Sequence, residues 1–69
     1  MVKIDLTPIE EFIAENKLTY STFCWYCHIS ASTLRKIRKG QYVRLSTAVS
    51  ISLNMMCPLS RLVVAVRRE

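Results

Sequence analysis

Residues 18–40, LTYSTFCWYCHISASTLRKIRKG, decide the fold of this 69-residue chain. Two segments with apolar residues at helical spacing, 20–27 and 31–39, are separated only by His28-Ile29-Ser30. Ser30 is a favourable N-cap for the second segment, and Gly40 stands where a helix C-terminus favours a residue that tolerates positive φ. Two short helices joined by so few residues are typical of a helix-turn-helix.

The N-terminal flank predicts another helix, which starts at Pro8 and runs to about Asn16. Thr7 supplies the expected N-cap oxygen, and Pro8 occupies the first helical position, where its missing N–H costs nothing. Glu10 falls three residues after the cap, where its carboxylate can reach back to the cap amide.

On the C-terminal side, residues 41–44 are interpreted as a connector and Ser46 as the N-cap of a helix that Cys57-Pro58 interrupts. Helical spacing of apolar residues in 59–66 favours a fifth short helix, although residues 63–66 would also suit a strand added to a partner's sheet edge. The predicted fold class is therefore all-α. We expect one domain over residues 1–69, a compact bundle of four to five short helices.

Charge is unevenly distributed along the chain, whose net charge is +5. Residues 1–18 carry a net charge of −2, residues 19–44 carry +5 with no acidic residue, and residues 45–69 carry +2. A strongly basic segment of this kind favours an anionic partner. The middle of the chain is thus the part expected to bind nucleic acid.

The composition indicates a cytoplasmic protein. Three cysteines are an odd number, and the N-terminal residues do not resemble a secretory signal, which favours free thiols in a reducing compartment. The longest apolar run, Leu62–Val66, is far too short to cross a bilayer. We therefore expect a soluble chain with no membrane partner.

Cys24, Cys27 and His28 form the pattern C-x-x-C-H, which is an attachment site for c-type haem. Haem attachment would require export, and a zinc site that also used Cys57 would lack a second ligand pair. A redox C-x-x-C usually follows a strand, and none is expected before Cys24. The preferred interpretation is that both cysteines pack in the core, with no metal, no cofactor and no catalysis.

From Leu18 to Gly40 the chain resembles the Cro/CI-type (XRE family) helix-turn-helix DNA-binding domain. The likeness rests on the Leu18-Thr19 opening, the large and small pair Phe23-Cys24, the turn ending Ile29-Ser30 and the closing Gly40. It covers roughly residues 8–63, the expected core of the domain. The resemblance implies a lambda-repressor-like fold and a sequence-specific transcriptional regulator that binds double-stranded DNA.

Carried over by position, the resemblance implies contacts to phosphates and base edges from the starts of both helices of the motif and from the loop that follows. The second helix of the motif would enter the major groove. His28 stands where the family usually has Gly, and Ala31 replaces a long amide side chain. The implied contact residues are Tyr20, Ser21, Ser30, Ala31, Ser32, Thr33, Arg35, Lys36, Lys39, Gln41 and Arg44.

A homodimer is expected, because one short recognition helix gives little affinity alone. The candidate dimer surface is Leu59, Leu62, Val63 and Val66. Trp25 and Tyr26 lie off the inward face of their predicted helix and are expected to be partly exposed. They support an alternative function, a helix-turn-helix scaffold that acts as a protein-interaction module of antitoxin or anti-repressor type.

Overall fold

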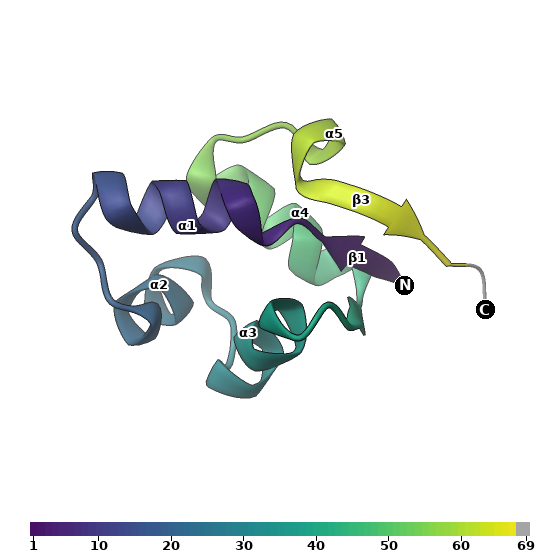
Figure 1. Ribbon diagram of the computed structural model, residues 1–69, viewed down its shortest axis with the longest axis horizontal. Helices are drawn as coiled ribbons and strands as arrows, with labels where there is room; N and C mark the ends of the chain where they lie inside the picture. The colour runs from purple at the N-terminus through teal and green to yellow at the C-terminus, as the bar shows by residue number, and fades with distance from the viewer. Residues whose placement is uncertain (68–69) are drawn as a thin grey trace.

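The structure is a computed structural model that describes residues 1–67, and it combines five helices with a small sheet (Figure 1). The sheet and the N-terminus lie at one end of the molecule, and α2 and α3 lie along one side (Figure 1). In chain order the elements are β1 (Val2–Ile4), α1 (Leu6–Glu15), α2 (Tyr20–Cys27), α3 (Ala31–Arg38), β2 (Tyr42–Val43), α4 (Leu45–Met55), α5 (Leu59–Leu62) and β3 (Val63–Val66).

The sheet corrects the all-α prediction, because the fold is mostly but not entirely helical. Its strand order is β2-β1-β3, and both outer strands run antiparallel to β1. Val2 is paired with Val43 on one side and with Val66 on the other. Val2 and Ile4 are almost completely buried, so β1 closes one end of the helical core.

The C-terminal segment also differs from the expected fifth helix, which covers only Leu59–Leu62. The β-branched run that follows pairs as β3 with the chain's own β1. Leu62 is fully buried in the core. The prediction that Leu62 belongs to a dimer surface is therefore wrong.

Both caps predicted outside the central motif lie elsewhere. Helix α1 begins at Leu6, because an Asp5 carboxylate oxygen accepts a hydrogen bond of 3.0 Å from the Thr7 amide. Thr7 and Pro8 therefore lie inside the first turn, where an absent N–H is tolerated. Helix α4 begins at Leu45 with no side-chain cap, which places Ser46 inside the helix.

The two helices of the predicted helix-turn-helix and the predicted Ser30 cap are confirmed, except that α3 ends at Arg38 and not at Lys39. Thr19 caps α2, and the Ser30 hydroxyl caps α3 by accepting a hydrogen bond of 3.2 Å from the Thr33 amide. His28 ends α2 in the left-handed conformation, with φ of 57°, and its side chain is exposed. It occupies the backbone conformation that glycine adopts most readily. Gly40, at φ of 74°, does the same after α3.

The core confirms that the inward face of α2 consists of Phe23, Cys24 and Cys27. Phe23 and Cys27 are fully buried among Ile9 of α1, Ile37 of α3 and residues of α4. The Ser50 hydroxyl of α4 donates a hydrogen bond of 2.9 Å to the Cys27 carbonyl and so ties α4 to the end of α2. Among residues 1–67, no helix has the length and apolar character needed to cross a membrane.

The position of the α1 cap can be tested by mutation. Asp5→Ala is expected to lower the free energy of unfolding by about 1 kcal/mol, because it removes the acceptor for the Thr7 amide. Thr7→Ala, at the cap that the sequence favoured, is expected to change it by less than about 0.5 kcal/mol. Urea denaturation followed by circular dichroism measures both. A larger loss of unfolding free energy in Thr7→Ala than in Asp5→Ala would contradict the assignment of Asp5 as the cap of α1.

Candidate nucleic-acid interface

Helix α3 has one buried and one basic side. Leu34 and Ile37 are buried against the core, whereas the other side chains of the helix are exposed or half-buried. The exposed side begins with the small residues Ala31 and Ser32 and continues with the basic residues Arg35, Lys36 and Arg38, followed by Lys39 after the helix. Cations near the C-terminus also complement the helix dipole, so this side is both stable and strongly positive.

On one flank of α3, a hollow brings the two helices of the motif together. The start of α2 contributes Tyr20 and Ser21, and α3 contributes Ala31, Arg35 and Arg38. The Arg38 guanidinium lies 4.4 Å from the centroid of the Tyr20 ring. A cation at this distance over an aromatic face is attracted to it, so Arg38 holds the Tyr20 ring against α3.

On the other flank, Lys36 and Arg44 line a second hollow together with Thr33 and Thr47. Helix α4 also begins beside this hollow with no side-chain cap, so the first two amides of the helix, those of Leu45 and Ser46, have no capping side chain. Basic side chains and free helix N–H groups are the groups that bind phosphate oxygens without reading sequence. The two hollows therefore place candidate phosphate contacts on both sides of α3.

The hydroxyl groups at the start of α3 bond to one another. Ser30 Oγ lies 2.9 Å from Thr33 Oγ1 and 3.0 Å from Ser32 Oγ, in addition to accepting from the Thr33 amide. Ser30 therefore has a structural role at the helix start. Ser32 is exposed and Thr33 is half-buried, so Ser32 presents more of its side chain to a ligand.

Most of the predicted contact residues thus fall on one surface. Lys39 lies in a third hollow beside Tyr20, Arg35 and Arg38, and Gln41 is exposed just beyond α3. Arg38 and Thr47 also line these hollows and were not among the predicted contacts. Arg38 belongs to the basic run and could have been found from it, whereas Thr47 carries no sequence signal. The residues that line the first two hollows and were predicted as contacts are Tyr20, Ser21, Ala31, Thr33, Arg35, Lys36 and Arg44.

The structure confirms that Cys24 and Cys27 pack in the core. Cys24 and Cys27 are buried free thiols, and Cys57 is a half-buried free thiol. Burial raises the pKa of Cys24, and burial together with the charge of Cys24 raises the pKa of Cys27 to about 11. A protonated thiol is a poor nucleophile and a poor metal ligand. Over residues 1–67, no three His, Cys, Asp or Glu side chains are grouped so that they could hold a metal ion.

Thiol reactivity tests the burial of this pair. At pH 8 the native protein is expected to react rapidly with a thiol reagent such as DTNB at Cys57 alone, because Cys27 stays protonated below a pKa of about 11. All three cysteines are expected to react after unfolding in denaturant. Cys57→Ser is the matched control and should remove the rapid phase. Rapid release of more than one equivalent from the native protein would contradict this packing.

Comparison with known proteins supports the architecture. No protein-family model matches the chain, and no curated protein matches its sequence. Among solved structures, the chain is similar to the crystal structure of transcriptional regulator VanUg, Form II, with a TM-score of 0.73 and 15% sequence identity. The similarity covers 97% of this chain and 89% of the other. The two chains therefore share a fold over almost their whole length.

Proposed function

We propose that this chain is a DNA-binding transcriptional regulator of Cro/CI type that places α3 in the major groove. The observation that carries the proposal is the exposed basic side of α3, which has candidate phosphate contacts on both flanks. The structural neighbour VanUg is itself described as a transcriptional regulator, which supports the same kind of function for this fold. In a helix-turn-helix of this form, the first turn of the second helix contacts the base edges.

The proposal assigns different roles to the basic residues. Arg35 follows one turn after Ala31 on the exposed side of α3 and is long enough to reach a base edge. Lys36, Lys39 and Arg44 lie farther from the helix start and are assigned to phosphates. Because Ala31 offers only an apolar contact, base recognition depends mainly on Arg35 and Ser32.

We also propose that the protein binds DNA as a homodimer, formed through the free edge of β3. Met1 and Arg67 exchange two hydrogen bonds. In an antiparallel pair, hydrogen-bonded and non-bonded residue pairs alternate, so the next residue of β3, Val66, directs its backbone N–H and C=O groups away from β1 and toward the open edge. Val66 lies across from the buried Val2, yet it is 74% exposed. A second β3 running antiparallel would pair these groups and cover Val66, which extends the sheet across a two-fold axis.

Trp25 supports the alternative function, a helix-turn-helix scaffold that binds another protein. It is 79% exposed on α2, and the neighbouring Tyr26 is 43% exposed, which agrees with the expectation that both lie off the inward face. Large exposed aromatic side chains are common in protein interfaces. DNA binding remains the preferred function, because basic residues surround α3 whereas Trp25 and Tyr26 carry no charge.

Fluorescence anisotropy with labelled duplex DNA tests the DNA-binding proposal. Arg35→Ala is expected to weaken binding to a selected site by about 1–3 kcal/mol and to relax its sequence preference. Lys36→Ala is expected to weaken binding to all sequences and to reduce the slope of log K against log salt concentration by about one. Arg61→Ala is the control, because it removes the same charge from α5, which lies on a different side of the molecule from α3 (Figure 1).

The salt dependence separates the two candidate functions. Steep loss of affinity with increasing salt, reduced by Lys36→Ala but not by Arg61→Ala, supports the DNA-binding proposal. If the folded protein binds no duplex at low salt, or if Arg61→Ala has the same effect as Lys36→Ala, the proposal is wrong.

The β3 edge is tested by sedimentation equilibrium. The wild-type protein is expected to approach twice the chain mass of 8.0 kDa as its concentration rises, and Val66→Lys is expected to remain a monomer. Leu53→Lys is the matched control, because Leu53 of α4 is 73% exposed and lies outside the sheet. A wild-type monomer at all concentrations, or dimers that tolerate Val66→Lys, would show that this edge does not form the dimer.

A further inference from the structure

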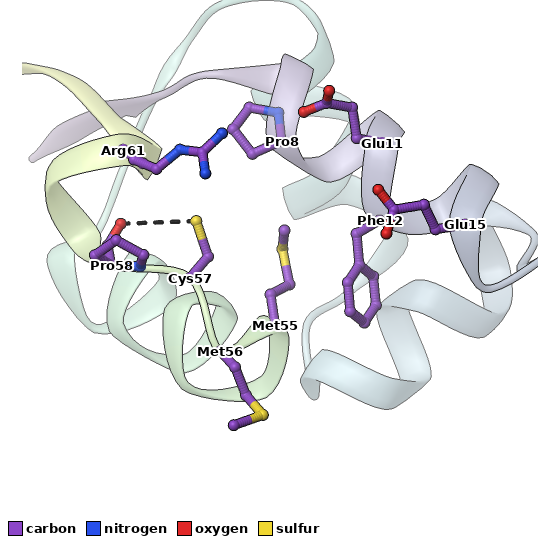
Figure 2. Close-up of a pocket in the computed structure, with 9 residues that line it drawn as sticks. All are labelled: Pro8, Glu11, Phe12, Glu15, Met55, Met56, Cys57, Pro58 and Arg61. Carbon is purple, nitrogen blue, oxygen red and sulfur yellow. Dashed lines mark hydrogen bonds between the residues drawn. The ribbon is translucent and has the colours of Figure 1, made fainter.

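A groove opens between α1 and the connection from α4 to α5, on a different side of the molecule from α3 (Figures 1 and 2). It encloses about 320 Å³. One wall is formed by α1, and the opposite wall is formed by residues 55–58 and by Arg61 of α5. We call it the α1/α4 groove, and none of the proposed DNA contacts lines it.

Two apolar side chains lie at the inner surface of the groove, between its polar rims. Phe12 and Met55 are half-buried and pack against the core, and Figure 2 shows both side chains directed into the space between the walls. The Phe12 ring also lies 5.9 Å from the Tyr26 ring, measured between centroids. The apolar surface therefore continues from the groove toward the exposed part of α2.

Met56 lies at the edge of the groove. Its side chain is 92% exposed, more than any other large apolar side chain in residues 1–67. Its backbone has φ of 53°, a conformation that costs a non-glycine residue about 1 kcal/mol or more. A glycine would end α4 here without that cost. Flexible methionine side chains are well suited to pack against varied apolar partners.

Acidic residues give the groove a charge opposite to that of the α3 surface. Glu11 and Glu15 are exposed on the same face of α1, one turn apart, and both line the groove. Like charges at this spacing repel each other, so a cation between them would be favoured. In a chain with five acidic residues and a net charge of +5, this pair makes the α1 wall acidic, and the one basic side chain that lines the groove, Arg61, lies on the opposite wall. The acidic wall disfavours nucleic acid and favours a basic ligand.

We propose that the α1/α4 groove binds a peptide segment of another protein, with an apolar anchor side chain flanked by lysine or arginine. The anchor would pack on Phe12, Met55 and Met56, and the basic residues would face Glu11 and Glu15. This arrangement corresponds to an amphipathic helix seated in an apolar groove. Because the groove and the α3 surface are separate, a DNA-bound protein would keep this docking site open.

The probe for this proposal is a fluorescein-labelled amphipathic helical peptide of leucine and lysine, compared with a leucine and glutamate peptide of the same pattern. Anisotropy is measured with the wild-type protein and with the double variant Glu11→Gln and Glu15→Gln. Glu10→Gln is the matched control, because Glu10 lies on the same helix but lines a hollow beside α3 instead. Met56→Ser tests the apolar contact, and its exposure leaves folding intact.

The leucine and lysine peptide is expected to bind the wild-type protein, and both the double glutamine variant and Met56→Ser should weaken it about tenfold, near 1.4 kcal/mol. Glu10→Gln should have no effect, and the leucine and glutamate peptide should not bind. No binding of the basic peptide, or equal weakening by Glu10→Gln, overturns the proposal. Duplex DNA affinity of the double glutamine variant and of Met56→Ser should be unchanged, because neither change touches the α3 surface. Loss of peptide binding is therefore distinguishable from loss of DNA binding.

Discussion

The three-residue connection between α2 and α3 is the constraint on which the rest of the structure depends. His28 takes the left-handed conformation, the Ile29 amide donates to the Cys24 carbonyl at 2.9 Å, and Ser30 caps the next helix. These contacts fix the angle between the two helices, so that Phe23 and Cys27 face Ile37 in the core. The same geometry leaves the basic side of α3 exposed and brings the start of α2 beside it.

The sequence predicted those parts of the fold that carry local signals. The bounds of α2 and α3, the Ser30 cap and the inward face of α2 follow from residues within one or two helical turns of each other. The sheet carries no such local signal, because β1 is only three residues long and pairs with β3, which begins at Val63, near the other end of the sequence. Residues 59–66 keep helical spacing until pairing with β1 overrides it. The α1 cap was misplaced because Asp5 and Thr7 are both good caps and only the structure distinguishes them.

The candidate site was predictable to a similar degree. Position in the motif and positive charge identified Arg35, Lys36 and Arg44, which the structure places on or beside the exposed side of α3. The contact of Arg38 with Tyr20 and the position of Thr47 depend on tertiary packing and carry no pattern in the sequence. The molecule also separates its charges: the basic surface surrounds α3, and Glu11 and Glu15 lie along the α1/α4 groove. Two faces of opposite charge suit two different partners.

The central claim is that α3 and its flanks form the DNA-binding surface. The most direct test is a titration of ¹⁵N-labelled protein with duplex DNA, followed residue by residue in amide correlation spectra. The account predicts the largest shift changes at residues 20–21, 30–39 and 44–47, with little change at residues 8–15 and 55–61. Changes centred on the α1/α4 groove or on Trp25 and Tyr26, with α3 unaffected, would contradict it.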